Sequence, residues 1–239
     1  MLNVQAVFYS SIFFNCLPLG TVGGDVARVL LARKFALSVK QLVLSVLVDR
    51  VITVGALIIL AVVALPSIAH PLAVTAWFGS AVILVSGVAG FLLLQPIVRM
   101  LGRWRDQRFI YLVLRTAEEL RYLIHRGGLI GLVWALLSAS CSALAAYCIA
   151  RSLSIQIGLI EMIAISSIVT LVVALPISLA GWGVREVSFV ALLGLLGVDR
   201  ETALLLSVEF GIIVTLMSLP GGVIWLTLGK HRHVSLSTK

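Results

Sequence analysis

Long runs of hydrophobic residues, separated by a few short charged stretches, make up most of this chain. Residues 51–98 contain no Asp, Glu, Lys or Arg, and neither do residues 127–150, 162–184 and 210–229. A helix needs about 20 apolar residues to cross the hydrocarbon core of a bilayer. Each stretch is long enough for one crossing, and the first is long enough for two. Because backbone groups in lipid must be paired within the element, the runs predict helices.

The ends of the apolar runs place the individual elements. Crossing helices are predicted over about residues 39–65, 72–94, 129–150, 155–175 and 202–219. A short apolar element at 4–17 precedes them, and an apolar segment of about 15 residues lies at 184–198. Residues 109–124 mix apolar and charged side chains at helical spacing, which predicts an amphipathic helix on the membrane surface. A solvated loop is the alternative interpretation of that segment.

Two runs rich in proline and glycine, at residues 17–25 and 175–183, interrupt the apolar pattern. Their turn-forming residues are Pro18, Gly23, Gly24, Pro176, Gly181 and Gly183. Proline removes a backbone donor and glycine weakens a helix, so both runs are predicted to be broken or re-entrant segments.

The two interruptions also resemble each other. In both, a Leu-Pro pair is followed by glycine five residues after the proline and by charge nine or ten residues after it. Both lead into a long helix containing Leu-Ser-Val, with an offset that changes from 158 to 162 residues. The pattern predicts an internal repeat over about residues 4–65 and 155–228, with coincidence among common residues as the alternative. Paired interruptions of this kind mark the substrate site of many transporters.

Charged residues in or near these apolar segments are the candidates for binding a substrate. A charge at mid-bilayer costs at least ~2.5 kcal/mol, so such residues usually pair, face the protein interior or contact a substrate. The candidate substrate-binding residues are Asp25, Arg28, Arg185, Glu186 and Glu209. Arg28 and Arg185 lie beside glycine-rich turns that enter helices, where free N–H groups and the positive end of the dipole favour a phosphate. Structural ion pairs, or long side chains reaching toward the interface, are the alternative.

Composition and charge agree with a membrane location. Of the 239 residues, 61% are hydrophobic and 12% are charged, and the mean hydropathy is +1.15. A soluble domain carries about 25% charge. The net charge of +8 does not indicate nucleic-acid binding, because the basic residues gather in residues 99–126 and in the tail 230–239. Basic loops of membrane proteins lie on the cytoplasmic side, so residues 99–126 are predicted to be a cytoplasmic arginine-rich loop.

That assignment does not decide on which side of the membrane the C-terminal tail lies. It places the uncharged turn at 66–71 outside, and simple counting then places the basic tail outside as well, against the positive-inside rule. Two explanations remain. Either the segment 184–198 crosses the membrane, or the Pro-Gly-Gly sequence at 220–222 turns the chain back.

The sequence does not indicate catalysis, a metal or a cofactor. Cys16, Cys141 and Cys148 lie in apolar runs, and no histidine or carboxylate is spaced to join them. The four histidines are scattered, and the chain has no Walker-type phosphate-binding loop. We therefore expect a protein that is not an enzyme.

The same signatures resemble a known family, the flippase-like transmembrane proteins related to the membrane region of lysylphosphatidylglycerol synthase. The similar segments are residues 15–18 (N-C-L-P), 23–28 (G-G-D-V-A-R), 45–50, 175–176 (L-P), 181–186 (G-W-G-V-R-E) and 194–203. The resemblance covers nearly the whole chain. It implies a multi-pass protein of the bacterial inner membrane that moves, or helps to display, a phospholipid or lipid-linked headgroup.

The chain also differs from the family that it resembles. The full synthase carries a soluble aminoacyl-transferase domain, whereas only ten residues follow Gly229, so transferase activity is not expected here. Relatives have further helices before the first signature, which implies a chain lacking N-terminal helices. The alternative function is a non-catalytic scaffold or accessory subunit that docks a lipid-modifying transferase through residues 99–126.

Together these patterns predict an all-α integral membrane bundle of about six crossings. Two broken or re-entrant segments belong to the repeat. A single transmembrane domain is expected over residues 1–229, followed by the basic tail.

Overall fold

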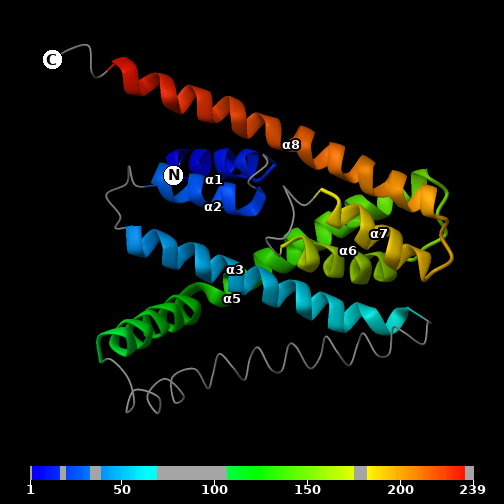
Figure 1. Ribbon diagram of the computed structural model, residues 1–239, viewed down its shortest axis with the longest axis horizontal. Coiled ribbons are helices and arrows are strands. Elements are labelled where there is room, and N and C mark those ends of the chain that lie inside the picture. The colour runs from blue at the N-terminus through cyan, green and yellow to red at the C-terminus, as the bar shows by residue number, and fades with distance from the viewer. Residues whose placement is uncertain (1, 17–19, 33–38, 69–106, 175–181, 235–239) are drawn as a thin grey trace. The chain divides into compact units, whose positions relative to one another are not determined.

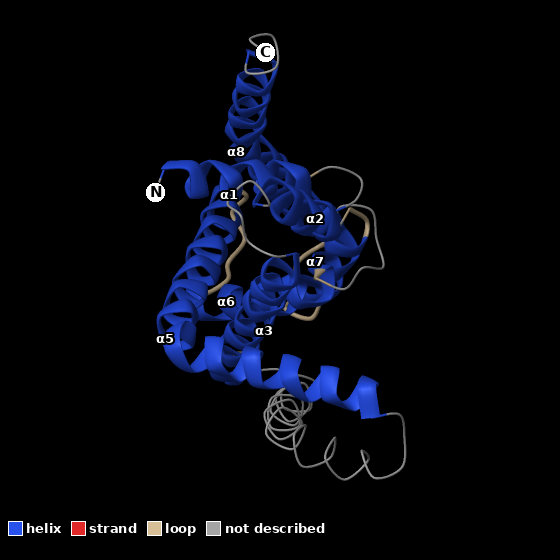
Figure 2. Cartoon of the chain, turned by 90° about the vertical axis from the view of Figure 1, so that its left-hand side faces the viewer, coloured by secondary structure: helices blue, strands red, loops and turns tan. Residues whose placement is uncertain are grey.

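A computed structural model of the chain describes residues 2–16, 20–32, 39–68, 107–174 and 182–234. Every regular element in these ranges is helical, and no strand occurs among them (Figure 2). The helices are α1 (Leu2–Asn15), α2 (Gly20–Ala32), α3 (Val39–Ala64), the 3₁₀ turn η2 (Leu65–Ser67), α5 (Gln107–Ser152), α6 (Leu159–Val173), α7 (Val184–Gly194) and α8 (Arg200–Val234) (Figure 1). The predicted all-helical class is confirmed.

Three helices of the described part are long and apolar enough to cross a membrane. These segments are Gln41–Ser67, Gly127–Ser152 and Arg200–Leu226. The helix predicted at 72–94 lies outside the described residues, so the number of about six crossings stays a prediction. The helix predicted at 39–65 is confirmed, since α3 ends at Ala64 and a 3₁₀ turn containing Pro66 follows it.

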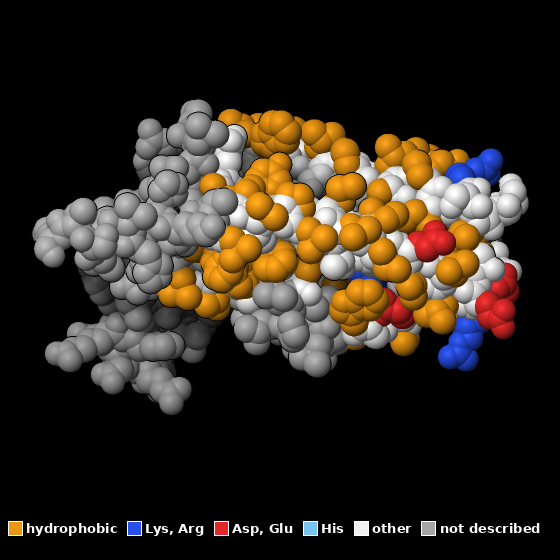
Figure 3. Space-filling view, turned by 90° about the horizontal axis from the view of Figure 1, so that it is seen from above, with side chains coloured by type: hydrophobic (Ala, Val, Ile, Leu, Met, Phe, Trp, Pro, Cys, Tyr) orange, Lys and Arg blue, Asp and Glu red, His pale blue; other side chains and the backbone are white. Residues whose placement is uncertain are grey.

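Large hydrophobic side chains are exposed on these candidate spans. Val63, Leu129 and Met217 have exposed fractions of 72%, 76% and 76%. On the face drawn in Figure 3, hydrophobic side chains cover much of the surface of the described residues, and charged side chains are few among them. Such a surface suits contact with lipid rather than with water.

Helix α8 corrects the prediction that the last helix ends before Pro220. The helix runs through this proline to Val234. Proline removes one intrahelical hydrogen bond, a loss that membrane helices tolerate where neighbouring helices pack around the site. The next residue meets α1 closely, because a Cβ at Gly221 would lie 2.1 Å from the backbone oxygen of Tyr9. The Pro-Gly-Gly sequence is thus part of a helix contact, not a break.

Helix α5 joins two segments that were predicted as separate helices, over 109–124 and 129–150. It has 46 residues, or about 70 Å of helix, against a hydrocarbon core of about 30 Å. Figure 2 shows that α5 changes direction along its length. The helical state of 109–124 is confirmed, while its position on the membrane surface stays a prediction.

Four of the helices are shorter than the hydrocarbon core. Helices α1, α2, α6 and α7 have 14, 13, 15 and 11 residues, which corresponds to about 16–22 Å. Helix α6 begins at Leu159, later than the predicted start at residue 155, because the chain turns at Ser154, which has a φ of 60°. The Glu161 carboxylate then accepts a 2.8 Å hydrogen bond from the N–H of Gly158 and caps the start of α6.

The first predicted interruption is shorter than expected. Gly23 and Gly24 were predicted to lie in a broken turn, but α2 begins at Gly20 and includes both. The reason for glycine at position 24 is packing, since a Cβ there would lie 1.8 Å from Oδ1 of Asn15 and 2.6 Å from the backbone oxygen of Ser11. Small residues let helices approach closely in this way. Pro18 lies outside the described residues.

The second predicted interruption is described only at its end. Pro176 and Gly181 lie outside the described residues. Gly183 has a φ of +83°, a left-handed conformation that glycine adopts readily, and it directly precedes α7. The prediction of a turn at Gly183 is therefore correct.

The chain falls into two compact units that both combine distant segments. The first contains Met1–Val43, Ile149–Ile155 and Val172–Lys239, and the second contains Leu44–Cys148 and Gln156–Leu171. In the first unit, α1 packs against α2 and α8, and α7 packs against α8. In the second unit, the end of α3 packs against α6. The residues of this cluster are Ala64, Leu65, Ile68, Ile163, Ala164 and Ile168.

Candidate functional site

The candidate charges of both signatures lie in the first unit. Asp25 and Arg28 belong to α2, Arg185 and Glu186 to the first turn of α7, and Glu209 to α8. The sequence analysis predicted that these five residues bind a substrate. The structure joins Arg185 with Glu186, whereas Glu209 is half-buried and has no hydrogen bond or ion pair with another described residue.

Arg185 and Glu186 form a largely buried ion pair. The Nη2 and Nε atoms of Arg185 donate to Oε1 of Glu186 over 2.9 and 3.2 Å. The two side chains are only 11% and 13% exposed. The guanidinium carbon lies 4.6 Å from the ring centroid of Trp182, a cation–π geometry. Two neighbouring residues of the second signature, Trp182 and Glu186, therefore hold the positive charge of Arg185 in place.

Glu186 also caps the helix that carries it. Its Oε2 accepts a hydrogen bond from the N–H of Gly183, the residue before α7. A glutamate at the third helical position commonly reaches back to the capping residue in this way. One carboxylate thus contacts both a cation and the positive end of a helix.

The guanidinium of Arg185 rests against α8. A Cβ added to Gly211 would lie 2.1 Å from Nη2 of Arg185, so glycine is what leaves room for the cation. Beside this contact, the rings of Phe189 and Phe210 meet edge to face with centroids 6.2 Å apart. One turn before Gly211, Ser207 is fully buried, and its Oγ has no hydrogen-bond partner among the described residues.

The turn between α7 and α8 lies at the end of the candidate span Arg200–Leu226. Gly197 has a φ of +79°, and the N–H of Val198 bonds the Leu193 carbonyl over 3.2 Å, closing α7. Asp199 then caps α8 by accepting a 2.8 Å bond from the N–H of Thr202. That hydrogen bond lowers the pKa of Asp199 below its ordinary value.

Arg28, the arginine of the first signature, also lies over an aromatic ring. Its guanidinium carbon is 5.0 Å from the ring centroid of Phe8 on α1. Asp25 and Arg28 are half-buried, and both have interaction partners. Each signature arginine is therefore partly shielded and stacked on an aromatic side chain.

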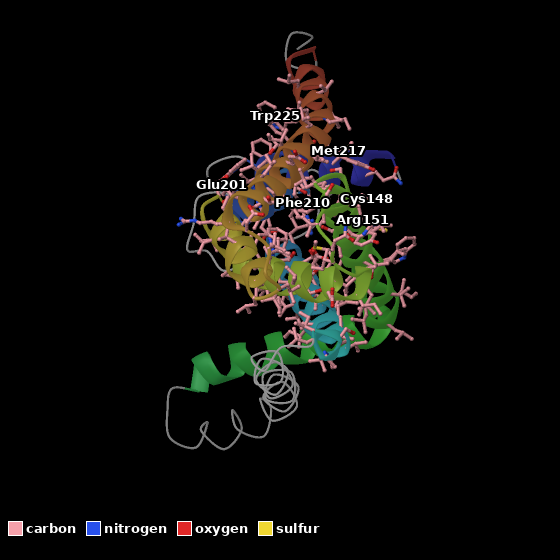
Figure 4. The ribbon with its side chains drawn as sticks, turned by 90° about the vertical axis from the view of Figure 1, so that its right-hand side faces the viewer. Cys148, Arg151, Glu201, Phe210, Met217 and Trp225 are labelled. Carbon is pink, nitrogen blue, oxygen red and sulfur yellow. The ribbon has the colours of Figure 1, made fainter. Side chains whose placement is uncertain are left out.

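Helix α1 contacts α8 farther along the helix than α7 does. A Cβ at Gly222 would lie 3.0 Å from the ring of Phe13, and the rings of Phe14 and Trp225 meet edge to face at 5.5 Å. Figure 4 shows Phe210, near the contact with α7, and Trp225, in the contact with α1, at separate places along α8. The ten residues from Gly211 to Gly221 correspond to about 15 Å along the helix axis.

Sequence reasoning missed three residues of this arrangement. Trp182, Gly211 and Phe8 were not candidates, yet they place the two arginines. Glycine inside an apolar helix is a known sign of close approach. The aromatic partners carry no comparable signal in a chain this hydrophobic.

The part of the chain that the structure describes forms only helices, with three candidate spans, apolar exposed faces and a largely buried ion pair on the short helix α7. These features define a helical membrane protein. More specifically, the chain belongs to the family of the lysylphosphatidylglycerol synthase TM region, whose family model matches residues 2–222. The suspected resemblance is confirmed, and the family relates the protein to membrane lipids. Comparisons with curated proteins and with solved structures found no match.

Proposed function

We propose that this protein is a flippase-like transporter, not an enzyme, and that it moves a phospholipid or lipid-linked headgroup across the bacterial inner membrane. The observation that carries the proposal is the largely buried ion pair of Arg185 and Glu186 at the start of α7, with Trp182 against its guanidinium. A largely buried charge in an apolar protein is costly unless it is paired or used. A guanidinium beside a helix N-terminus offers the two kinds of donor that bind phosphate oxygens.

Arg28, the arginine of the first signature, supports a substrate that contacts both signatures. Arg28 lies over Phe8, as Arg185 lies over Trp182. Stacking keeps a guanidinium ordered and partly dehydrated, yet it leaves the N–H donors at the edge of the group available for an acceptor. We infer that both arginines attract the lipid phosphate, while Asp25, Glu186 and Glu209 balance charge or meet a cationic headgroup.

The order of the helices supports the proposed repeat. Helices α1, α2 and α3 have 14, 13 and 26 residues, and α6, α7 and α8 have 15, 11 and 35. Each proposed half thus consists of two short helices followed by a long one. In addition, α1 packs against α8 and α6 packs against α3, so the short first helix of each half contacts the long helix of the other. Interlocked halves of this kind are common in transporters that rock around a central site.

Headgroup transfer between leaflets tests the proposal. The protein is reconstituted into vesicles with a fluorescent phospholipid, and the rate at which the label becomes accessible to an external quencher is measured. Arg28→Ala and Arg185→Ala should each slow transfer about tenfold or more, because a charge-assisted bond to phosphate is lost. Arg151→Ala is the control, since Arg151 is an exposed residue at the end of α5. Unchanged transfer in both signature variants would remove the two arginines from the mechanism.

A scaffold that docks a lipid-modifying transferase is the second candidate. The observation that favours it is the length of α5, whose residues 107–126 continue beyond the candidate span Gly127–Ser152. Four arginines in that stretch would suit an acidic partner. Co-purification of a stable transferase together with absent lipid transfer in vesicles would favour this role.

A further inference from the structure

The Glu186 carboxylate occupies a position that suits a phosphate. One of its oxygens accepts from the Arg185 guanidinium, and the other accepts from the N–H of Gly183 at the start of α7. A phosphate at a helix N-terminus beside an arginine takes these same two kinds of donor. The site is therefore filled by an anion that belongs to the protein.

The contact between Arg185 and Glu186 is not a product of helix geometry. Side chains at positions i and i+1 of a helix point in different directions and do not face each other. Arg185 must therefore fold back to meet Glu186, and it does so where Trp182 and Gly211 receive the guanidinium. These surroundings hold Arg185, so the cation can keep its place if the carboxylate leaves.

A larger anion would find donors that Glu186 does not use. A guanidinium has five N–H donors in a fixed fork. Of the guanidinium nitrogens, Nε and Nη2 are the two whose hydrogen bonds Glu186 accepts. Ser207 adds an independent observation, because its fully buried Oγ lacks a partner among the described residues and lies one turn before Gly211 on the same face of α8. A phosphate has more acceptor oxygens than a carboxylate, so it could accept from these additional donors.

We propose that Glu186 is a built-in competitor of the substrate: its carboxylate holds Arg185 until a lipid phosphate displaces it. This inference rests on the proposed lipid transport and adds how the site is regulated. Without lipid, Glu186 neutralises the cation and prevents it from binding other anions. When the phosphate of a lipid arrives, the guanidinium of Arg185 exchanges one anion for the other while it keeps its contact with α8.

The decisive variant is Glu186→Gln in the full-length protein. Glutamine keeps an oxygen that can accept from the Gly183 N–H, but it loses the charge that competes for Arg185. We expect this variant to bind phosphatidylglycerol about tenfold more tightly than the wild type, because a charge-assisted bond no longer has to be broken. Glu201→Gln is the matched control, since Glu201 is exposed in the first turn of α8 and the substitution changes the net charge equally. It should bind as the wild type does.

The fluorescence of Trp182 provides a second measurement, which would not change if Glu186 had a purely structural role. Displacement of Glu186 changes the surroundings of the guanidinium that lies on this ring, so phosphatidylglycerol should change the tryptophan emission of the detergent-solubilised wild type. Trp182→Phe should lose that change although four other tryptophans remain. Diacylglycerol, which lacks a phosphate, should leave the emission unchanged. An equal response to inorganic phosphate at the same concentration would overturn a lipid as the displacing ligand.

The outcomes separate this inference from the proposed function. If Arg185→Ala loses phosphatidylglycerol binding but Glu186→Gln binds no more tightly than the wild type, Arg185 is a binding residue and Glu186 is not its competitor. If Arg185→Ala retains full binding, the proposal that lipid phosphate binds at Arg185 is wrong. Should Glu186→Gln fail to fold, an unchanged wild-type emission at saturating phosphatidylglycerol would be enough to reject the displacement.

Discussion

At the scale of single residues, glycines decide how closely the helices of this protein pack. Gly24 and Gly211 both lie where a Cβ would overlap another side chain, and the two positions differ in what the Cβ would meet. At Gly211 the neighbour is the flexible end of Arg185. At Gly24 the neighbours include the backbone oxygen of Ser11, which cannot move without moving α1.

We predict that Gly24→Ala destabilises the protein by about 1–3 kcal/mol, the usual cost of overpacking. The methyl group would force α1 and α2 apart. The measurement is thermal unfolding in detergent, followed by the loss of helical circular dichroism. Gly55→Ala is the control, because nothing lies within 4 Å of a Cβ at Gly55 in α3. It should be neutral or stabilising by up to about 1 kcal/mol, and equal effects of both substitutions would contradict the packing argument.

The residue types of the site were predictable from the sequence, but their partners were not. Arg185 and Glu186 stood out because charges are rare in these apolar segments. Nothing in the sequence indicated that they would pair with each other, since adjacent helical residues usually diverge. The pair forms because Trp182 and Gly211 accept the folded-back guanidinium, and Gly211 comes from a different helix.

At the scale of helices, Asp199 determines where α8 begins. Its carboxylate accepts from the N–H of Thr202, and this bond lowers its pKa. A lowered pKa in the folded protein means that the cap contributes stability above the pKa of the unfolded chain. That contribution is lost as the pH falls through the lower value of the folded state.

We therefore predict that Asp199→Asn lowers the melting temperature at about pH 7 and that the difference from the wild type shrinks toward about pH 3. Asparagine can still cap the helix, so the variant isolates the effect of the charge. Melting temperatures in detergent across this range are the measurement. Glu201→Gln, which removes a nearby carboxylate that does not cap α8, should keep the wild-type pH profile. A constant difference across the range would show that the charge of Asp199 is not responsible.

The boundaries of the helices were harder to predict than their existence. From local sequence, the last helix was predicted to end before Pro220, and α5 was predicted as two separate helices. In the structure both helices continue. Proline and glycine weaken a helix by about 1–3 kcal/mol per residue. Contacts with a neighbouring helix can offset such a cost, and Tyr9 and Phe13 of α1 lie against Gly221. The local sequence around Pro220 does not show a contact with residues more than 200 positions away.

At the scale of the whole molecule, the proposed halves hold each other through two contacts. Helix α1 lies on α8, and α6 lies on the end of α3. Neither contact includes Arg28 or Arg185. If transport depends on the interlocked halves, damage to either contact should impair movement without removing the residues that we propose to bind the lipid.

We predict that Ala164→Leu and Gly221→Ala each slow lipid transfer severalfold and cost about 1–3 kcal/mol of stability. Ala164 is fully buried against Ala64 and Leu65, and Gly221 meets the backbone of Tyr9. Transfer is measured in vesicles, and phosphatidylglycerol binding is measured in detergent. Binding should persist in both variants. Ala145→Leu, on an exposed position of α5, should change neither quantity. Loss of binding together with transfer would show that these contacts shape the site itself.

Hydropathy and periodicity were enough to establish the helical membrane class, the approximate helix at 39–65 and the charged residues of the two signatures. These features depend on local physics, because an apolar run long enough to cross the hydrocarbon has few other stable conformations. Tertiary structure decided which helix each signature contacts, how Glu186 reaches Arg185 and why glycine stands at positions 24 and 211. Those features depend on side chains and backbone brought together from distant parts of the chain, where steric fit and charge pairing override local preference.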